Sequence, residues 1–147
     1  MVRAITITDI TKAAVTDDGT LLPLFASRPA AGFPAPGDDE VEKALDLNDL
    51  LIENPTATFF VKVEGDSMEG AGIFSGDVLV VDRSIGPTHG RIVVAAVYGE
   101  MVVKRLDQTA TTTRLLSEQA GYTPINVTDN DDCFIWGVVV GSVRLFN

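Results

Sequence analysis

A serine in a glycine-flanked turn is the first residue whose setting could support catalysis. Ser67 stands in Gly-Asp-Ser-Met-Glu-Gly, directly after the stretch 58–64, whose β-branched and aromatic residues predict a strand. A nucleophile has to project from a sharp turn, where backbone N–H groups can point at a developing oxyanion. The motif meets this need, but Gly-Asp-Ser is also an ordinary capped turn. Ser67 is therefore a weak candidate until a base is found.

The single histidine of the sequence is a poor candidate for that base. His89 lies in Gly-Pro-Thr-His-Gly, a turn in which an exposed polar residue is expected in any case. A Ser-His-Asp triad is therefore not expected, because no suitable histidine base is present. The Ser-Lys variant, in which a lysine is the base, is the remaining form of the same chemistry.

Lys104 is the lysine whose surroundings fit a base. It stands in Met-Val-Val-Lys-Arg-Leu on a predicted strand, and alternation puts it on the face of Val102 and Leu106. Burial there would lower the lysine pKa, as acceptance of a proton from serine requires. The alternative is an edge-strand lysine that guards against aggregation. Because Met101 and Val103 are apolar too, the pattern leaves the inward face open.

Short strands separated by turn formers predict a mainly β fold from residue 58 onward. The candidate strands are 58–64, 77–82, 91–98, 100–106, 112–116, 125–128 and 133–146. Tyr98-Gly99 indicates a tight hairpin between two of them. Without alternating helices, this spacing favours an antiparallel β sandwich or partly open barrel. One short helix is expected within 46–54, where an Asp or Asn cap precedes leucines and Asn54-Pro55 stops it.

Residues 1–40 are expected to form a flexible or extended arm, and residues 41–147 a single domain. Within the arm, the stretch 28–37 reads Arg-Pro-Ala-Ala-Gly-Phe-Pro-Ala-Pro-Gly, which has too many breakers for a helix or central strand. A chain of 147 residues can bury one sizeable core but is short for two ordinary domains. Taken alone, Ala31-Gly32 in this arm is a plain linker.

Charge and composition argue against several classes of protein. The formal net charge is −10, and between residues 38 and 53 seven acids face one lysine, which argues against direct DNA binding. This acidic stretch is a solvated face or a docking surface for a basic partner. One cysteine and one histidine permit no zinc cluster, so neither metal nor cofactor is expected. No secretory signal and no membrane-length apolar run is found, which predicts a cytoplasmic protein.

Four blocks of the sequence, taken together, resemble a known family. The Gly-Asp-Ser-Met turn is followed by Ser75-Gly-Asp-Val-Leu-Val-Val-Asp82, then His89-Gly-Arg-Ile-Val-Val94, then Val102-Val-Lys-Arg105. Their order and spacing resemble the LexA/UmuD peptidase domain. The stretches 46–52 and 54–61 narrow the likeness to UmuD, and it covers about 32–145. Type I signal peptidases are similar across these blocks but need a membrane anchor, for which the sequence offers no candidate.

The resemblance implies a self-cleaving serine peptidase. Ser67 is then the nucleophile of a Ser/Lys dyad, Lys104 the general base, and the Ser67 N–H an oxyanion donor. In the family the scissile bond joins a small residue to glycine ahead of the peptidase domain, which here corresponds to Ala31-Gly32. UmuD proteins often have cysteine where this sequence has Ala31, whereas LexA repressors have alanine.

The resemblance also implies a role in the SOS response to DNA damage. The chain would cut itself on meeting a RecA nucleoprotein filament, and the product would serve as a homodimeric accessory subunit of an error-prone, UmuC-like Y-family polymerase in translesion synthesis. One alternative is a LexA-like regulator, but only 31 charge-balanced residues precede Gly32, too few for a winged helix-turn-helix. The other is an inactive, dimeric binding module, against which the presence of both Ser67 and Lys104 argues.

Overall fold

A long antiparallel sheet forms most of the computed structural model, which describes residues 5–13, 21–25 and 41–146. The strand order in this sheet is β1-β4-β5-β10-β6-β7-β8-β9, and β2 and β3 pair in a separate two-stranded sheet. The strands are β1 (Thr6–Lys12), β2 (Leu21–Phe25), β3 (Val41–Asp46), β4 (Thr58–Glu64), β5 (Val78–Asp82), β6 (Ile92–Val97), β7 (Glu100–Gln108), β8 (Thr113–Leu116), β9 (Ile125–Asn126) and β10 (Cys133–Val143). One α-helix, α1 (Leu47–Leu51), and two 3₁₀ turns, η2 (Pro55–Ala57) and η3 (Glu69–Ala71), complete the described elements.

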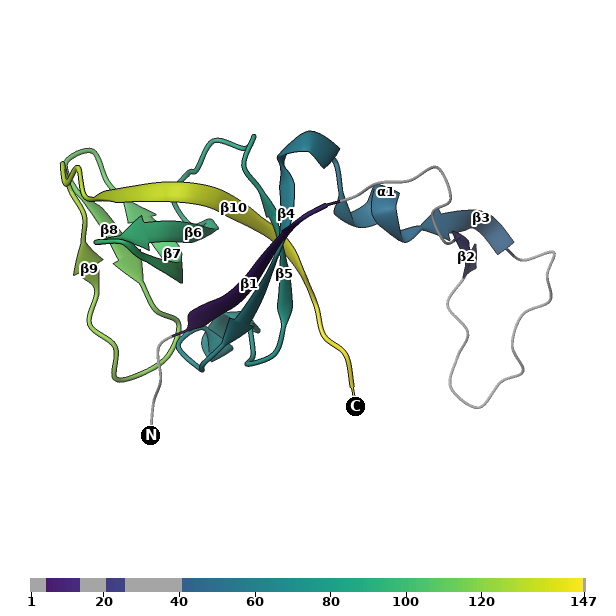
Figure 1. Cartoon of the computed structure of the whole chain (residues 1–147), viewed down its shortest axis with the longest axis horizontal. Helices are drawn as coiled ribbons and strands as arrows, with labels where there is room; N and C mark the ends of the chain where they lie inside the picture. The colour runs from purple at the N-terminus through teal and green to yellow at the C-terminus, as the bar shows by residue number, and fades with distance from the viewer. Residues whose placement is uncertain (1–4, 14–20, 26–40, 147) are drawn as a thin grey trace.

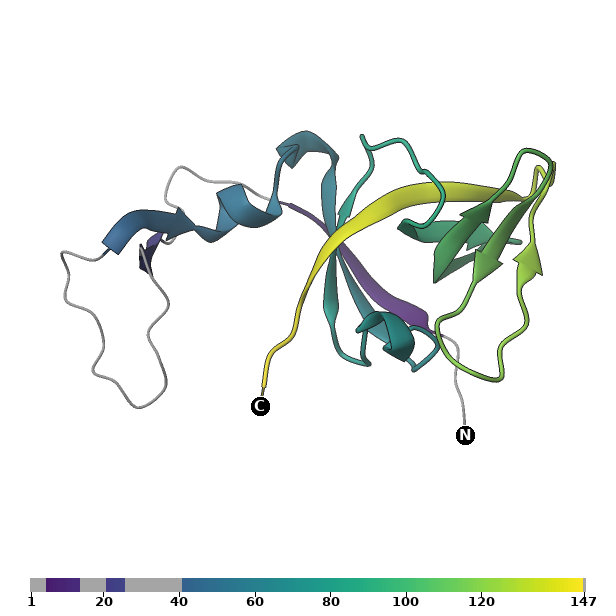
Figure 2. The same cartoon turned by 180° about the vertical axis from the view of Figure 1, so that it is seen from behind.

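Strand β10 makes the sheet curl into an open half-barrel. Its first half pairs with β6 and its second half with β5, and the register shifts once in each ladder. Such bulges bend a strand and increase its twist. Figures 1 and 2 show β10 in yellow crossing the molecule between the two halves of the sheet. The predicted mainly β, partly open barrel is therefore confirmed.

The core consists of two apolar clusters, one for each half of the sheet. The first is made by Ile5, Val61, Val63, Met68, Ile73, Leu79, Val81, Val94 and Val103. The second is made by Val93, Ala95, Val97, Leu106, Leu115 and Val138. Residues of β6 and β7 enter both clusters, so the two faces of these strands are both buried. In the described part of the chain, no helix is long and apolar enough to cross a membrane.

Most of the expected elements are present, with shifts at their ends. The strand expected at 58–64 is β4, and α1 lies within the helix expected at 46–54. Asp46 caps α1, because its Oδ1 accepts a hydrogen bond of 2.9 Å from the N–H of Asn48. The strand expected at 125–128 is reduced to the two residues of β9, and β10 ends at Val143, three residues before the expected end.

Two strands lie in the range that the sequence assigned to an arm. β1 pairs antiparallel with β4 and is an edge strand of the main sheet, while β2 pairs with β3. The sequence pattern of β1 is broken because the register shifts between Ile7 and Asp9, so that its isoleucines do not keep a spacing of two. In both views the β2–β3 sheet projects beyond α1, away from η3 and from the beginning of β1 (Figures 1 and 2).

An ion pair between the buried Asp77 carboxylate and the more exposed Arg144 fixes the turn that lies between β4 and β5. The Asp77 carboxylate accepts hydrogen bonds from Arg144 Nε at 2.8 Å and from the Phe74 N–H at 2.9 Å. The hydrogen bond with Arg144 lowers the pKa of Asp77, although burial of the carboxylate opposes this shift. The guanidinium also lies 4.1 Å from the Phe74 ring centroid.

A backbone clasp holds the turn after β4 against the segment after β8. The N–H of Glu118 donates to the Ser67 carbonyl at 2.8 Å, and the N–H of Gly70 donates to the Glu118 carbonyl at 2.7 Å. The approach at Gly70 is so close that a Cβ there would lie 2.4 Å from the Glu118 carbonyl oxygen. Only glycine fits at this position without moving the backbone.

Gly70→Ala is therefore expected to destabilise the protein by about 1–3 kcal/mol, because the added methyl forces the two segments apart. Gly86→Ala is the matched control, since a Cβ at Gly86 meets nothing within 4 Å, and it should change stability by less than about 0.5 kcal/mol. Urea unfolding of the three proteins measures the difference. Equal stability of both variants would show that the two segments can move apart at Gly70 without a loss of stability.

Candidate active site

The turn after β4 carries Ser67 into the interior of the protein. Gly65 has a φ of 111°, a backbone conformation that side chains disfavour, and its N–H donates to Ser75 Oγ at 3.2 Å. Met68 is fully buried in the first apolar cluster and anchors the far side of the turn. Ser67 lies between these two anchors and is 0% exposed.

The hydroxyl of Ser67 contacts the beginning of β1. Its Oγ accepts a hydrogen bond of 3.0 Å from the backbone N–H of Ile5, a residue 62 positions away in the sequence. The Ile5 side chain is 3% exposed and packs in the same cluster as Met68. The Ser67 hydroxyl is thus bound by Ile5, the residue directly before β1, in this structure.

Lys104 lies in the middle of β7 and is also buried, with 5% of its surface exposed. Its Nζ donates to Ser117 Oγ at 2.5 Å and lies 5.3 Å from the ring centroid of Tyr122. Burial lowers the pKa of Lys104, because the charged ammonium loses its water while the neutral amine loses little. Val103 packs in the first cluster and Leu106 in the second, which is why the sequence pattern left the inward face open.

The segment after β8 brings the serine turn and Lys104 together. Ser117 accepts from Lys104, and the next residue, Glu118, donates its N–H to the Ser67 carbonyl. A second link runs through Tyr122, whose hydroxyl donates to Asp66 Oδ1 at 3.0 Å beside the ammonium of Lys104. Among the described residues, no hydrogen bond joins Ser67 Oγ to Lys104 Nζ directly, and each holds a different partner.

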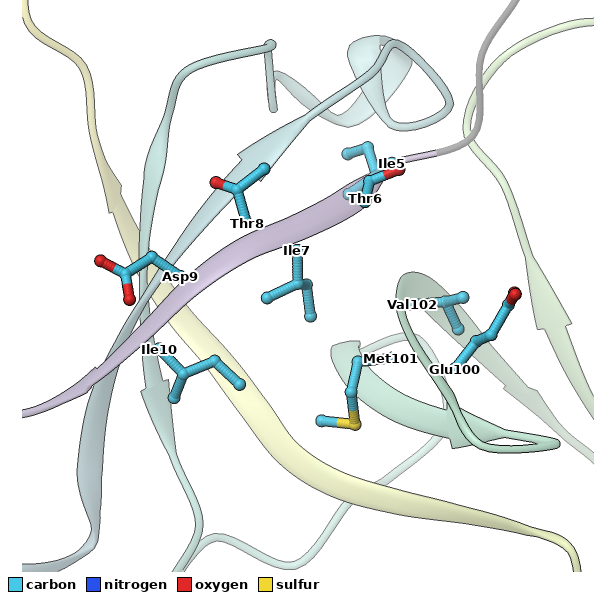
Figure 3. Close-up of a pocket in the computed structure, with 9 residues that line it drawn as sticks. All are labelled: Ile5, Thr6, Ile7, Thr8, Asp9, Ile10, Glu100, Met101 and Val102. Atoms are coloured by element: carbon cyan, nitrogen blue, oxygen red, sulfur yellow. The ribbon is translucent and has the colours of Figure 1, made fainter.

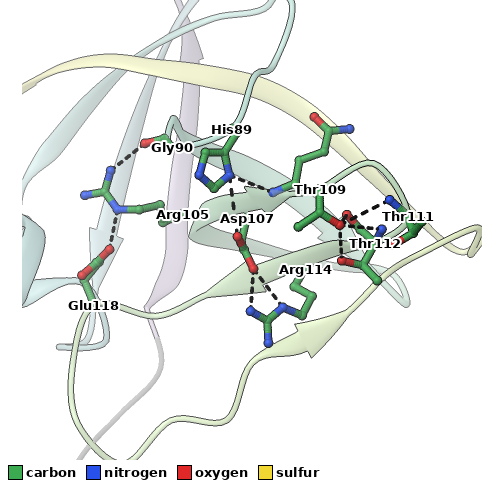
Figure 4. Close-up of polar contacts among 10 residues, drawn as sticks. His89, Gly90, Arg105, Asp107, Thr109, Thr111, Thr112, Arg114 and Glu118 are labelled. Carbon is green, nitrogen blue, oxygen red and sulfur yellow. Dashed lines mark hydrogen bonds and ion pairs between the residues drawn. The ribbon is translucent and has the colours of Figure 1, made fainter.

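Glu118 also holds β7 at this place. Its carboxylate pairs with Arg105 Nε, and Arg105 Nη1 donates to the Gly90 carbonyl at 2.7 Å (Figure 4). One residue therefore fixes the backbone on the Ser67 side and the side chain next to Lys104. The segment 117–118 therefore contacts both a buried serine and a buried lysine whose pKa is lowered, the two kinds of group that a Ser/Lys pair requires.

His89 lies away from these groups. It is 64% exposed, its Nδ1 accepts from the N–H of Gln108 at 3.0 Å, and it lies 3.6 Å from Asp107, which also binds Arg114 (Figure 4). These contacts tie a loop to β7. In the part of the chain that the structure describes, no three His, Cys, Asp or Glu residues are grouped so that they could hold a metal ion.

Sequence reasoning missed Ser117, Glu118 and Tyr122, which belong to no recognised motif. The register of the β7–β8 hairpin is the signal that could have found the first two. Arg105 pairs with Leu116, and continuing this antiparallel register puts Lys104 opposite Ser117. Ala31 and Gly32 lie outside the described residues, in the stretch between β2 and β3.

Comparison with known proteins supports the family that the four blocks suggested. A family described as Peptidase S24-like matches residues 23–140. Protein ImpA of Salmonella typhimurium is 53% identical over 90 residues, which cover 61% of this chain and 62% of that protein. Protein MucA of the same species is 39% identical over 130 residues, covering 83% and 84% of the two chains.

A LexA repressor, from Bordetella parapertussis, is 38% identical over 124 residues, which cover 84% of this chain but only 56% of the repressor. The matched region thus spans about three fifths of ImpA, most of MucA and little more than half of this repressor. Because the family match includes the serine turn, β7 and the segment between them, the chain belongs to the S24-like peptidases, as a UmuD-like member of the LexA/UmuD family.

Proposed function

We propose that this protein is a self-cleaving serine peptidase in which Ser67 is the nucleophile and Lys104 the general base. The supporting observation is the burial of both side chains around the segment 117–118, together with the desolvation that lowers the pKa of Lys104. A lysine at the surface would stay protonated near neutral pH and could not accept the serine proton.

The proposed reaction opens the bond between Ala31 and Gly32. Neutral Lys104 takes the proton of Ser67, whose Oγ attacks the carbonyl carbon of Ala31 while the Ser67 N–H donates to the developing oxyanion. Lys104 then returns the proton to the Gly32 nitrogen, which leaves as the new N-terminus. Water, activated by the same amine, hydrolyses the ester on Ser67 and releases the fragment 1–31.

The proposed biological setting rests on the resemblance to UmuD-like relatives. We infer that cleavage is stimulated by a RecA nucleoprotein filament during the SOS response. The product 32–147, with a peptidase and dimerisation domain over 41–147, would serve in the cytoplasm as a homodimeric subunit of an error-prone, UmuC-like translesion polymerase.

Loss of either dyad residue should stop self-cleavage. Ser67→Ala and Lys104→Ala are each expected to slow the appearance of fragment 32–147 by at least about 100-fold, because nucleophile or base is gone. The matched control is Lys62→Ala, which removes an exposed lysine from β4, and His89→Ala removes the lone histidine. Both should cut at the wild-type rate in gel assays with RecA, nucleotide and single-stranded DNA. Persistent cleavage in the Lys104 variant would refute the dyad.

The position of the cut is tested by intact mass. Wild-type protein should yield fragments 1–31 and 32–147, and Ala31→Asp should block their formation, because a charge would have to enter a small apolar pocket. Ala35→Asp carries the same charge four residues further along and should be cut normally. Fragments with other masses, or normal cutting of the Ala31 variant, would show that the cleaved bond is not Ala31-Gly32.

The rate of spontaneous cleavage should rise with pH. Only neutral Lys104 accepts the serine proton, and burial shifts its pKa downward without guaranteeing full deprotonation at pH 7. The rate of appearance of fragment 32–147 should therefore increase from pH 6 and level off once the amine is mostly neutral, with Ser67→Ala as the blank. A bell-shaped profile centred near neutrality would favour a histidine base or a contaminating protease.

A further inference from the structure

Strand β1 occupies the immediate surroundings of the nucleophile. The Ile5 N–H donates to Ser67 Oγ, and the following residues, 6–12, pair with β4, which leads into the serine turn. Because Ser67 has no exposed surface, solvent does not reach its hydroxyl in this form. The residue that covers it, Ile5, belongs to neither the serine turn nor the proposed cleavage stretch.

This arrangement is incompatible with attack on a peptide bond. The carbonyl carbon under attack has to approach to within about 3–3.5 Å of Oγ, and the backbone on either side of it needs a place to lie. Extended peptides are commonly bound by the free edge of a strand, and β1 already fills the edge of β4 beside Ser67. The Ile5 hydrogen bond also engages a lone pair of the attacking oxygen.

Few side chains of this segment are buried. Ile5, directly before β1, is buried and Ile7 is half-buried, whereas residues 6 and 8–12 are exposed. Only β4 is hydrogen-bonded to β1, with a register shift in the ladder. The other edge borders a pocket of about 610 Å³ that reaches Met101 and Val102 on β7 (Figure 3). Edge segments with few buried contacts open before the rest of a protein does.

We propose that residues 5–12 are an inhibitory latch, which occupies the strand edge beside Ser67 and must be released before the chain can cut itself. This inference rests on the proposed function and specifies how the same site is regulated. An activator then acts by favouring the released state, and the spontaneous rate is limited by the fraction of molecules in which the latch is open.

The first test adds a charge to the buried end of the latch. Ile5→Asp places an unpaired carboxylate in the first apolar cluster, which favours release, and should raise the RecA-independent cleavage rate by roughly tenfold or more. The matched control, Thr11→Asp, adds the same charge at an exposed position of the same strand and should leave the rate unchanged. An Ile5 variant that is cut no faster than the control would overturn the latch.

The second test locks the latch reversibly and does not depend on how Ile5→Asp folds. Thr6 and Glu64 are directly opposed across β1 and β4 and are both exposed. Cysteines at these two positions, in a Cys133→Ala background, fall within the reach of a disulfide. The oxidised protein should not be cut, and reduction should restore the rate of the uncross-linked protein. Thr6→Cys alone controls for the effect of oxidation itself.

The outcomes separate this inference from the function on which it rests. Equal cleavage of the oxidised and reduced double variant would overturn the latch and leave the Ser/Lys peptidase standing. If no form were cut, even with RecA or at alkaline pH, the proposed function would fall and the latch with it. Cutting of the reduced form alone would support both.

Discussion

The burial of a lysine is the constraint on which the rest of this structure depends. An ammonium group in an apolar sheet is costly, and here one hydroxyl, Ser117 Oγ, is the hydrogen-bond partner of Lys104 Nζ. Because the folded-state pKa lies below the unfolded value of about 10.4, the unfolded chain binds more protons between the two. Burial of the charged Lys104 therefore destabilises the folded state fully at pH values below its folded-state pKa. This destabilisation disappears as the pH rises from the folded-state to the unfolded-state pKa. The two apolar clusters flanking β7 have to outweigh it at neutral pH.

The surroundings of Lys104 show which features of the fold and the site can be predicted from the sequence. Runs of β-branched residues predicted β4, β5, β6 and β7, because a buried strand needs such side chains wherever it lies in the sheet. The same pattern left open whether Lys104 faces the interior, and it indicated none of its hydrogen-bond partners. Ser117 is placed by the register of a hairpin, and Glu118 by backbone hydrogen bonds. Neither the register nor the backbone bonds can be recognised from the types of the residues. The Ala31-Gly32 bond stays a prediction, because the structure does not describe it.

Strand β1 escaped prediction for a related reason. Its alternation is interrupted by a register shift, and most of its side chains face solvent, so that it resembles a polar linker in the sequence. It is held by the buried Ile5 directly before it, by the half-buried Ile7 and by backbone hydrogen bonds, which depend little on residue type. The features that hide the strand from a periodicity argument are also those that make it separable from the domain. A strand with a strong sequence signal would be bound too firmly to serve as a latch.

The order of segments along the chain would make release of the latch irreversible. While the chain is intact, residues 13–57 tether β1 to β4 covalently, and such a tether raises the effective concentration of one strand near the other. A cut at Ala31-Gly32 lies between the two strands and removes that tether, leaving β1 on a separate peptide. Its contacts with β4 are unchanged, but they must then hold at the far lower concentration of a free peptide. The affinity of β1 for β4 can thus be high enough for binding within the intact chain and still too low for the separate peptide to bind again after cleavage.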